Sequence, residues 1–235
     1  MNVSMKRIQA IFVKDYKEFY RNYAISTMVL MPLALAFIYS MTGDMDLQSL
    51  FMPINLTFAM ITAFIQSCLI AEEKEHNTLR SLLLSPASIA DVLIGKSALV
   101  FVITVIVLGL CMWILEFTPS NLLAMSSALV LSTVFYLAMG LIVGLYTKTV
   151  MEASVGILPV MIVFSFGPLV LLFADRYPIL EIFEWLPSAQ LILLEQYSST
   201  GATSDILTSL VVLTIWAVVA VMLSTFLFKK RMSDE

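Results

Sequence analysis

The sequence predicts an all-α integral membrane protein that crosses the bilayer six times, and two observations lead to this fold class. Of its 235 residues, 60% are hydrophobic and 13% are charged, and the mean hydropathy of +0.95 lies far above that of soluble globular proteins. The apolar residues also gather in long runs without alternation, and this pattern excludes a membrane β-barrel. We therefore expect residues 1–235 to form a single transmembrane domain.

Six apolar runs have the length that a helix needs to cross a bilayer core, which is roughly 20 residues. All six lack Asp, Glu, Lys, Arg and His. No cleavable signal peptide is expected before them, because the first 23 residues carry five cationic side chains and no uninterrupted apolar stretch. The expected spans are Ala24–Met41, Met52–Ile70, Ser97–Leu115, Leu122–Tyr146, Ala153–Phe173 and Ile206–Phe228.

The cationic residues lie almost entirely on one side of these spans. The two termini and the connections after the second and fourth spans hold 12 of the 13 Lys and Arg residues, and the other side holds only Arg176. Because cationic residues that flank the spans stay in the cytoplasm, we expect a multi-pass protein of the plasma membrane with both termini cytoplasmic.

Residues 1–23 are expected to form an amphipathic helix in the cytoplasmic interface. Apolar residues recur there at steps of three and four, whereas the Lys and Arg residues fall on other faces. A cationic face suits anionic lipid headgroups. The alternative is an ordinary cytoplasmic stub. The apolar residues are Met5, Ile8, Phe12, Tyr16 and Phe19.

Residues 71–96 form the longest expected cytoplasmic connection, which we call the elbow, and their pattern indicates two short helices. The first continues the second span over Glu72–Leu84, and Pro86 ends it. Ser88 can cap a second helix that runs to Ile94. A compact helical elbow below the membrane suggests a docking surface for a partner protein.

Residues 174–205, expected outside the cell, mix aromatic and aliphatic residues with acids and prolines. The segment is too hydrophobic for a free loop. We expect short re-entrant helices that dip into the outer leaflet, with Trp185 and Tyr197 at the interface and breaks at Pro178 and Pro187.

The sequence lacks the clusters of acids, bases, nucleophiles or metal ligands that an intramembrane enzyme needs. His76 is its one histidine and lies among cytoplasmic charges. Cys68 and Cys111 fall within spans and are expected to be free thiols. Since ion-coupled transporters use charged groups inside the membrane, the uncharged spans also argue against a self-powered transporter.

The stretch ADVLIGKS resembles a phosphate-binding loop, but Ala90 stands where the first glycine is required and no strand precedes it. We expect no ATP, metal or other cofactor on this chain. Gly95 and Lys96 are instead expected to mark a helix break followed by a cationic membrane anchor.

Gly140 and Gly144 form a GxxxG pair in the fourth span. Such a pair lets a second helix approach closely. Packing within the protomer and packing against another subunit are equally compatible with the pattern.

The elbow carries a resemblance to a known family. The segment EEKEHNTLRSLLLSPASIADVLIGK resembles the pattern of type-2 ABC exporter permeases, in which charged residues precede G-T-L, S-P and L-x-G-K. His76-Asn77 departs from it, because the family usually has a glycine there. The N-terminal helix, the six spans and the hydrophobic external helices extend the resemblance over nearly the whole chain. The matching residues are Thr78, Leu79, Ser85, Pro86, Gly95 and Lys96.

The resemblance implies a permease subunit that is not itself an enzyme. It implies a homodimer or heterodimer of permease subunits, paired with two separate ATP-binding cassette subunits that hold ATP and Mg. In such proteins the cytoplasmic extension of the second span fits a groove on the ATPase, and no nucleic acid takes part. The implied coupling residues are Glu72, Glu73, Glu75, His76, Thr78, Leu79, Leu82, Leu83, Ser85 and Pro86.

The resemblance also implies a cargo path between two permease subunits, along the first, second and fifth spans. Polar side chains there are candidates for the path, and interhelical hydrogen bonding is the alternative role. An uncharged path favours export of amphipathic or hydrophobic cargo, such as a peptide, toxin, antibiotic or lipid. The competing function is a channel or membrane scaffold that docks a partner without transport. The candidates are Asn55, Gln66, Ser67, Ser154 and Ser165.

Overall fold

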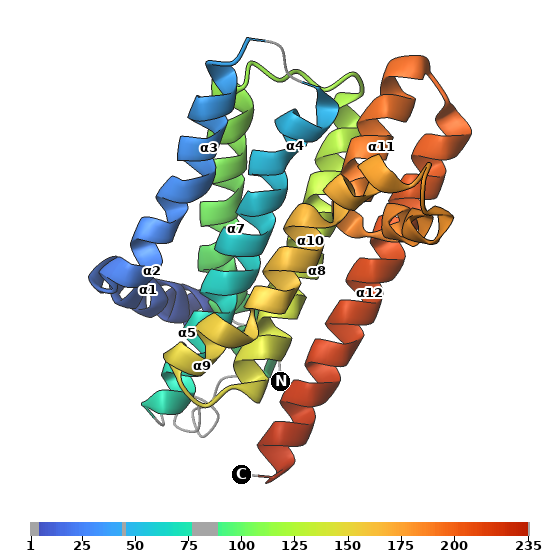
Figure 1. The fold of residues 1–235 in the computed structure, drawn as a ribbon. Coiled ribbons are helices and arrows are strands. Elements are labelled where there is room, and N and C mark those ends of the chain that lie inside the picture. The colour runs from blue at the N-terminus through green and yellow to red at the C-terminus, as the bar shows by residue number, and fades with distance from the viewer. Residues whose placement is uncertain (1–4, 44–45, 77–88, 235) are drawn as a thin grey trace.

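The computed structural model describes residues 5–43, 46–76 and 89–234, and every element in these three stretches is helical. Figure 1 shows long helices side by side in a bundle, with the helix α1 (Met5–Arg21) lying across one end of it. Both chain termini lie toward this end, which we call the α1 end. The connections after α3, α7 and α10 lie at the opposite end.

Among the described residues, five helical stretches are long and apolar enough to cross a membrane, so the chain is a multi-pass membrane protein. Each of them overlaps one of the last five expected spans. The stretches are Leu47–Glu75, Asp91–Ile114, Leu122–Tyr146, Val150–Phe173 and Thr203–Lys230. The elements that form them are α4 (Leu47–Leu56), η2 (Thr57–Ile65), α5 (Gln66–Glu75), α7 (Ile89–Ile114), α8 (Leu122–Tyr146), α9 (Val150–Gly156), α10 (Leu158–Val170), η3 (Leu171–Phe173) and α12 (Thr203–Asp234).

The first expected span is less regular than the other five. It consists of α2 (Tyr23–Ser26), the 3₁₀ turn η1 (Thr27–Val29) and α3 (Leu30–Ser40), and its apolar stretch Thr27–Ser40 is shorter than a standard span. Pro32 offers a physical reason, because it has no N–H to donate to the carbonyl of the preceding turn. The part of the chain that the structure describes therefore contains five candidate spans, whereas the sequence predicts six.

The second span lies at the centre of the bundle. Its apolar window is 94% buried, whereas the other four are 28–61% buried. Pro53 interrupts the helical hydrogen bonding, the Thr57 hydroxyl donates to the Pro53 carbonyl at 2.8 Å, and a π-helix follows over Thr57–Ile65. All nine residues of this π-helix are buried.

Gly140 and Gly144 bring α8 directly against this central helix. A Cβ atom at Gly140 would lie 2.4 Å from the Ala63 carbonyl oxygen, and one at Gly144 would lie 2.7 Å from the Ser67 carbonyl oxygen. The GxxxG pair thus packs within the protomer, which decides between the two alternatives left open by the sequence.

Two shorter helices, η4 (Pro178–Trp185) and α11 (Pro187–Thr200), precede α12 at the end opposite α1. Each begins at a proline. The Glu195 carboxylate accepts hydrogen bonds from the backbone N–H and the hydroxyl of Ser120, at 2.9 and 2.8 Å. These contacts join α11 to the connection between α7 and α8.

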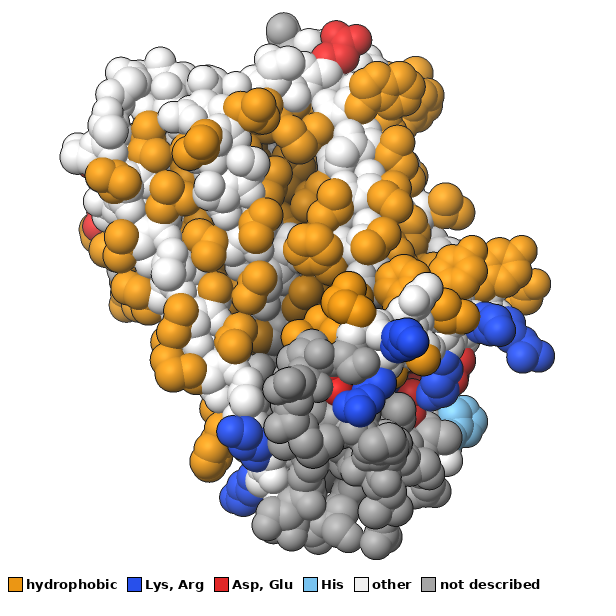
Figure 2. Space-filling view, turned by 180° about the vertical axis from the view of Figure 1, so that it is seen from behind, with side chains coloured by type: hydrophobic (Ala, Val, Ile, Leu, Met, Phe, Trp, Pro, Cys, Tyr) orange, Lys and Arg blue, Asp and Glu red, His pale blue; other side chains and the backbone are white. Residues whose placement is uncertain are grey.

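The surface of the bundle is rich in exposed hydrophobic side chains, as a lipid-facing surface requires. Figure 2 shows them spread over the face seen from behind, while the Lys and Arg side chains visible on that face gather toward the α1 end.

Candidate functional site

The helix α1 packs against the start of α7. In α1, Ile11 and Asp15 are buried, whereas Met5 and Tyr16 are exposed. A Cβ atom at Gly95 would lie only 2.9 Å from the Cβ atom of Ile11. Gly95 therefore allows α1 to cross α7 at close range, and this crossing positions Asp15 beside the next residue of α7.

That next residue, Lys96, is the centre of a buried group of charges. Its ammonium lies 3.2 Å from an Asp15 oxygen of α1 and 2.8 Å from a Glu73 oxygen of α5. The three side chains are at most 1% exposed. Lys14 pairs with the same Glu73 carboxylate and with Glu18 at 3.3 Å. We call these five residues the charged cluster.

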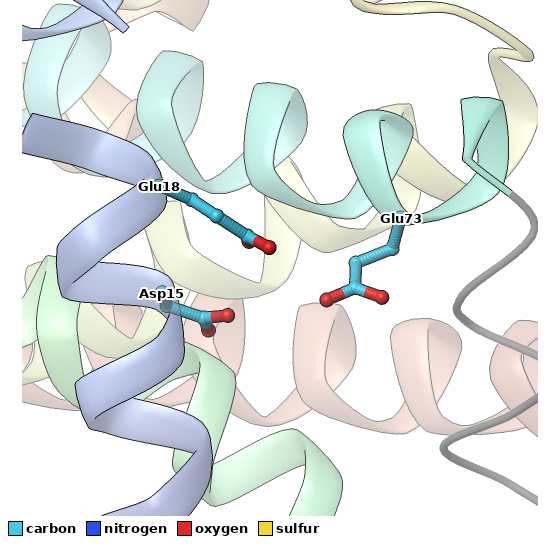
Figure 3. Close-up of side chains that lie close together, drawn as sticks. All are labelled: Asp15, Glu18 and Glu73. Atoms are coloured by element: carbon cyan, nitrogen blue, oxygen red, sulfur yellow. The ribbon is translucent and has the colours of Figure 1, made fainter. Parts of the chain in front are cut away.

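The three acids of the charged cluster point toward one another (Figure 3). Carboxylate oxygens of Asp15, Glu18 and Glu73 lie within 4.8 Å of one another, a spacing that could hold a metal ion. Lys14 and Lys96, however, already bind these carboxylates. A metal ion would have to displace their ammonium groups, so the arrangement fits an ion-pair network that joins three helices.

Burial has the largest effect on the pKa of Asp15. It raises the pKa of Asp15 from the usual 3.8 to about 6, although Lys96 acts in the opposite direction. Burial lowers the pKa of Lys14, but the bonds to Glu73 and Glu18 outweigh it and raise that pKa above its usual value. Lys14 is therefore charged at neutral pH, and Asp15 changes its charge in the mildly acidic range.

We expect the stability of the protein to depend on the charge of Asp15 between about pH 4 and 6. Because the folded-state pKa is above the unfolded one, the folded state holds more protons in this window, and its stability falls as the pH rises through it. The unfolding midpoints of the wild type and the Asp15→Asn variant are to be measured in detergent across this pH range. The difference between the two midpoints should change with pH up to about pH 6 and then level off. A difference that stays constant with pH would show that Asp15 has no raised pKa.

The end of α5 is also joined to α8 and α9. The Lys74 ammonium donates to the carbonyl oxygens of Leu145, at 2.7 Å, and Thr147, where α8 ends. The Glu75 carboxylate accepts from the backbone N–H of Val150, at 2.9 Å, where α9 begins. Both side chains satisfy helix-terminal groups that have no partner within their own helix. The end of α5, which we call the root of the elbow, is thus fixed to four other helices, α1, α7, α8 and α9.

The expected coupling residues fall into two groups. Glu73 belongs to the charged cluster, Glu72 is half-buried, and Glu75 and His76 are exposed at the end of α5. The others lie outside the described residues, which break off after His76 and resume at Ile89. These others are Thr78, Leu79, Leu82, Leu83, Ser85 and Pro86.

The expected helix break at Gly95 and the expected anchor role of Lys96 are wrong. The helix α7 runs without interruption from Ile89 to Ile114, so the second short helix of the elbow is the first part of α7. Lys96 is 1% exposed and bonded to two carboxylates instead of reaching the headgroups. Its tertiary partners therefore override the local pattern of a glycine followed by a cation.

Four of the five candidate path residues are buried inside the protomer. The Asn55 amide donates to the Ser188 carbonyl at 3.4 Å, and the Ser67 hydroxyl donates to the Phe64 carbonyl at 2.8 Å. The side-chain polar atoms of Gln66 and Ser165 are buried without a hydrogen-bond partner. In this conformation these four side chains do not face an open path.

Ser154 is the candidate path residue that lines a cavity. The cavity has a volume of about 340 Å³ and lies among the first, second and fifth expected spans. Cys68 contacts Ser154 at 3.8 Å and, like Cys111, is a free thiol. The lining residues are Asn22, Ile25, Met28, Met60, Phe64, Val150, Ser154, Leu158 and Met161.

The sequence interpretation missed the ion pairs of α1, in which Asp15 binds Lys96 and Lys14 binds Glu73. A signal was present, because Asp15 follows Ile11 by four residues and so shares its face of the helix. An acid on the buried face of an amphipathic helix requires a cation opposite it. The sequence does not say which of the cytoplasmic cations that partner is.

A family model described as "ABC-2 family transporter protein" matches residues 2–226. No curated protein sequence matches the chain. Membrane permeases of this kind lack an ATPase, which is a separate subunit in such systems. Because the match covers nearly all of the 235 residues, the chain belongs to the ABC-2 family of transporter proteins as a membrane permease component.

Proposed function

We propose that this chain is the permease subunit of an ATP-driven exporter, with six spans and both termini in the cytoplasm. Two permease subunits and two ATP-binding cassette subunits form the working complex. The charged cluster is the observation that carries this proposal, because it fixes α1 and α7 to the root of the elbow on which the ATPase would act.

The cluster gives the elbow a rigid connection to the spans. Glu73 stands before the elbow's undescribed residues and Lys96 stands after them, and the 2.8 Å ion pair holds these two helices together. Asp15 adds α1 to the same unit. Arg7 adds a second link from α1 to α7, at 3.2 Å from Asp91. A displacement of the elbow would therefore move α1, α5 and α7 as one body.

The cavity beside Ser154 is the part of the proposed cargo path that supports a cargo class. Its lining is mainly apolar and includes three methionines, Met28, Met60 and Met161. Methionine side chains adapt to apolar groups of different shapes. This lining supports an amphipathic or hydrophobic cargo, such as a peptide, toxin, antibiotic or lipid.

The test of this function is whether the elbow couples the chain to its ATPase. Leu82→Asp and Leu83→Asp should each release the ATPase subunit or abolish cargo-stimulated ATP hydrolysis, because apolar anchors at an interface centre can contribute about 2 kcal/mol or more. Membrane insertion should be unchanged. Copurification with a candidate ATP-binding cassette subunit from the same genome and ATP turnover with candidate cargo are the two measurements.

The control is Glu75→Ala, which removes an exposed side chain together with its hydrogen bond to the Val150 N–H and should have a smaller effect than either leucine variant. Normal association and normal transport in both leucine variants would contradict the proposed coupling. An ATPase that copurifies but never responds to any cargo would favour the scaffold function instead.

A further inference from the structure

Glu116, two residues after the end of α7, has a backbone conformation that glutamate rarely adopts. Its φ is +51°, and within the described residues no other residue except glycine has a positive φ. The Glu116 N–H donates to the Trp113 carbonyl at 3.2 Å, and the Phe117 N–H donates to the Met112 carbonyl at 2.9 Å. This hydrogen-bond pattern is a helix C-cap whose left-handed position is normally occupied by glycine.

The charge of Glu116 is unfavourable at this place too. The last carbonyl groups of a helix carry partial negative charge, so a carboxylate beside them is repelled and a cation is attracted. No Lys or Arg among the described residues forms an ion pair with Glu116. Glu116 thus has a strained backbone and a carboxylate without a cationic partner among the described residues, at a position where glycine would be more stable. Strain of this kind is found at binding sites.

Glu116 lines an open pocket of about 630 Å³ between α3 and the end of α7. Three aromatic side chains share the lining, Phe37, Trp113 and Phe117. Phe37 is 59% and Trp113 76% exposed, so both rings are available to a ligand. Met112 and Ile114 add apolar surface.

We propose that this pocket between α3 and α7 binds an organic cation with apolar arms. The carboxylate and the α7 carbonyl terminus both attract positive charge. Aromatic rings such as those of Trp113, Phe37 and Phe117, which line the pocket, attract a cation that lies over their faces. The apolar walls take the arms of the ligand. Binding sites for drug-sized molecules typically have volumes of about 300–1,000 Å³, and the volume of this pocket lies in that range. The proposal does not depend on the ATPase coupling or on the direction of transport.

Tetraphenylphosphonium is a suitable probe because it combines one delocalised charge with four apolar rings. The purified chain in phosphatidylcholine nanodiscs should bind the tritiated cation above the level of empty nanodiscs. Glu116→Gln, which removes only the charge, and Trp113→Leu, which removes an aromatic face, should each weaken binding by about fivefold or more, since a cation–π contact or a close charge contributes on the order of 1 kcal/mol.

Asp205→Asn is the matched control. Asp205 is also exposed and also lies at the end opposite α1, but it stands in the first turn of α12, away from the pocket. Its removal should leave binding unchanged. If the wild type binds no more than empty nanodiscs, as when lipid fills the pocket, or if Glu116→Gln and Asp205→Asn bind alike, the proposal is wrong.

Glu116→Gly separates a binding role from a structural one. Glycine relieves both the positive φ and the charge at the helix end, so the unfolding midpoint should rise by roughly 2 °C, while cation binding should fall as far as in Glu116→Gln. A variant that melts lower and keeps its binding would mean that Glu116 serves only the fold.

Discussion

Replacing Lys96 with methionine is expected to prevent the accumulation of folded protein. The variant would leave Asp15 and Glu73, both at most 1% exposed, without the ammonium that joins them. Removal of one partner from a buried ion pair costs about 3–5 kcal/mol, and the whole stability of a domain is only about 5–15 kcal/mol. The measurements are the yield of monodisperse protein in detergent and its unfolding midpoint.

The charge on the remaining carboxylates can be removed to test this cause. Adding Asp15→Asn and Glu73→Gln to Lys96→Met should recover much of the folded protein, because a buried ion pair replaced by neutral groups costs far less than a broken one. Lys148→Met is the control, since Lys148 is an exposed cation after α8. A Lys96→Met variant that folds like the wild type would contradict the structure of the cluster.

The spans were largely predictable because lipid imposes a strict rule of length and polarity. Leu122–Tyr146 was expected as the fourth span, and α8 has these same bounds. The first span was less predictable, since hydropathy measures apolar length and does not register the missing N–H of Pro32 or the 3₁₀ turn over Thr27–Val29. The apolar composition therefore determines which segments can cross the membrane, whereas backbone hydrogen bonding determines how regular each helix is.

The site was less predictable because its contacts join residues far apart in the sequence. Asp15 and Lys96 are 81 positions apart, and no local pattern couples them. A glycine followed by a lysine, as in Gly95 and Lys96, indicates a membrane boundary in many helices. The crossing of Ile11 over Gly95 gives the pair its actual role, and only the packing of α1 reveals that crossing.

Gly140→Ala and Gly144→Ala are expected to destabilise the protein strongly although each adds only one methyl group. The added Cβ atoms would lie 2.4 and 2.7 Å from backbone carbonyl oxygens of the central helix, and a backbone cannot yield as a flexible side chain can. Overpacking costs about 1–3 kcal/mol per site. Each kcal/mol lowers the unfolding midpoint by roughly 2–4 °C in a protein of this size.

Gly109→Ala is the matched control because it also lies within a membrane-spanning helix, α7, but a Cβ atom there would meet nothing within 4 Å. That variant should match or exceed the wild-type midpoint, since alanine is the better helix former. The oligomeric state provides the second readout. Because the GxxxG pair packs inside the protomer, the folded fraction of the Gly140→Ala and Gly144→Ala variants should keep the subunit number of the wild type. A variant that keeps its midpoint and has fewer subunits than the wild type would instead place the pair at a subunit interface.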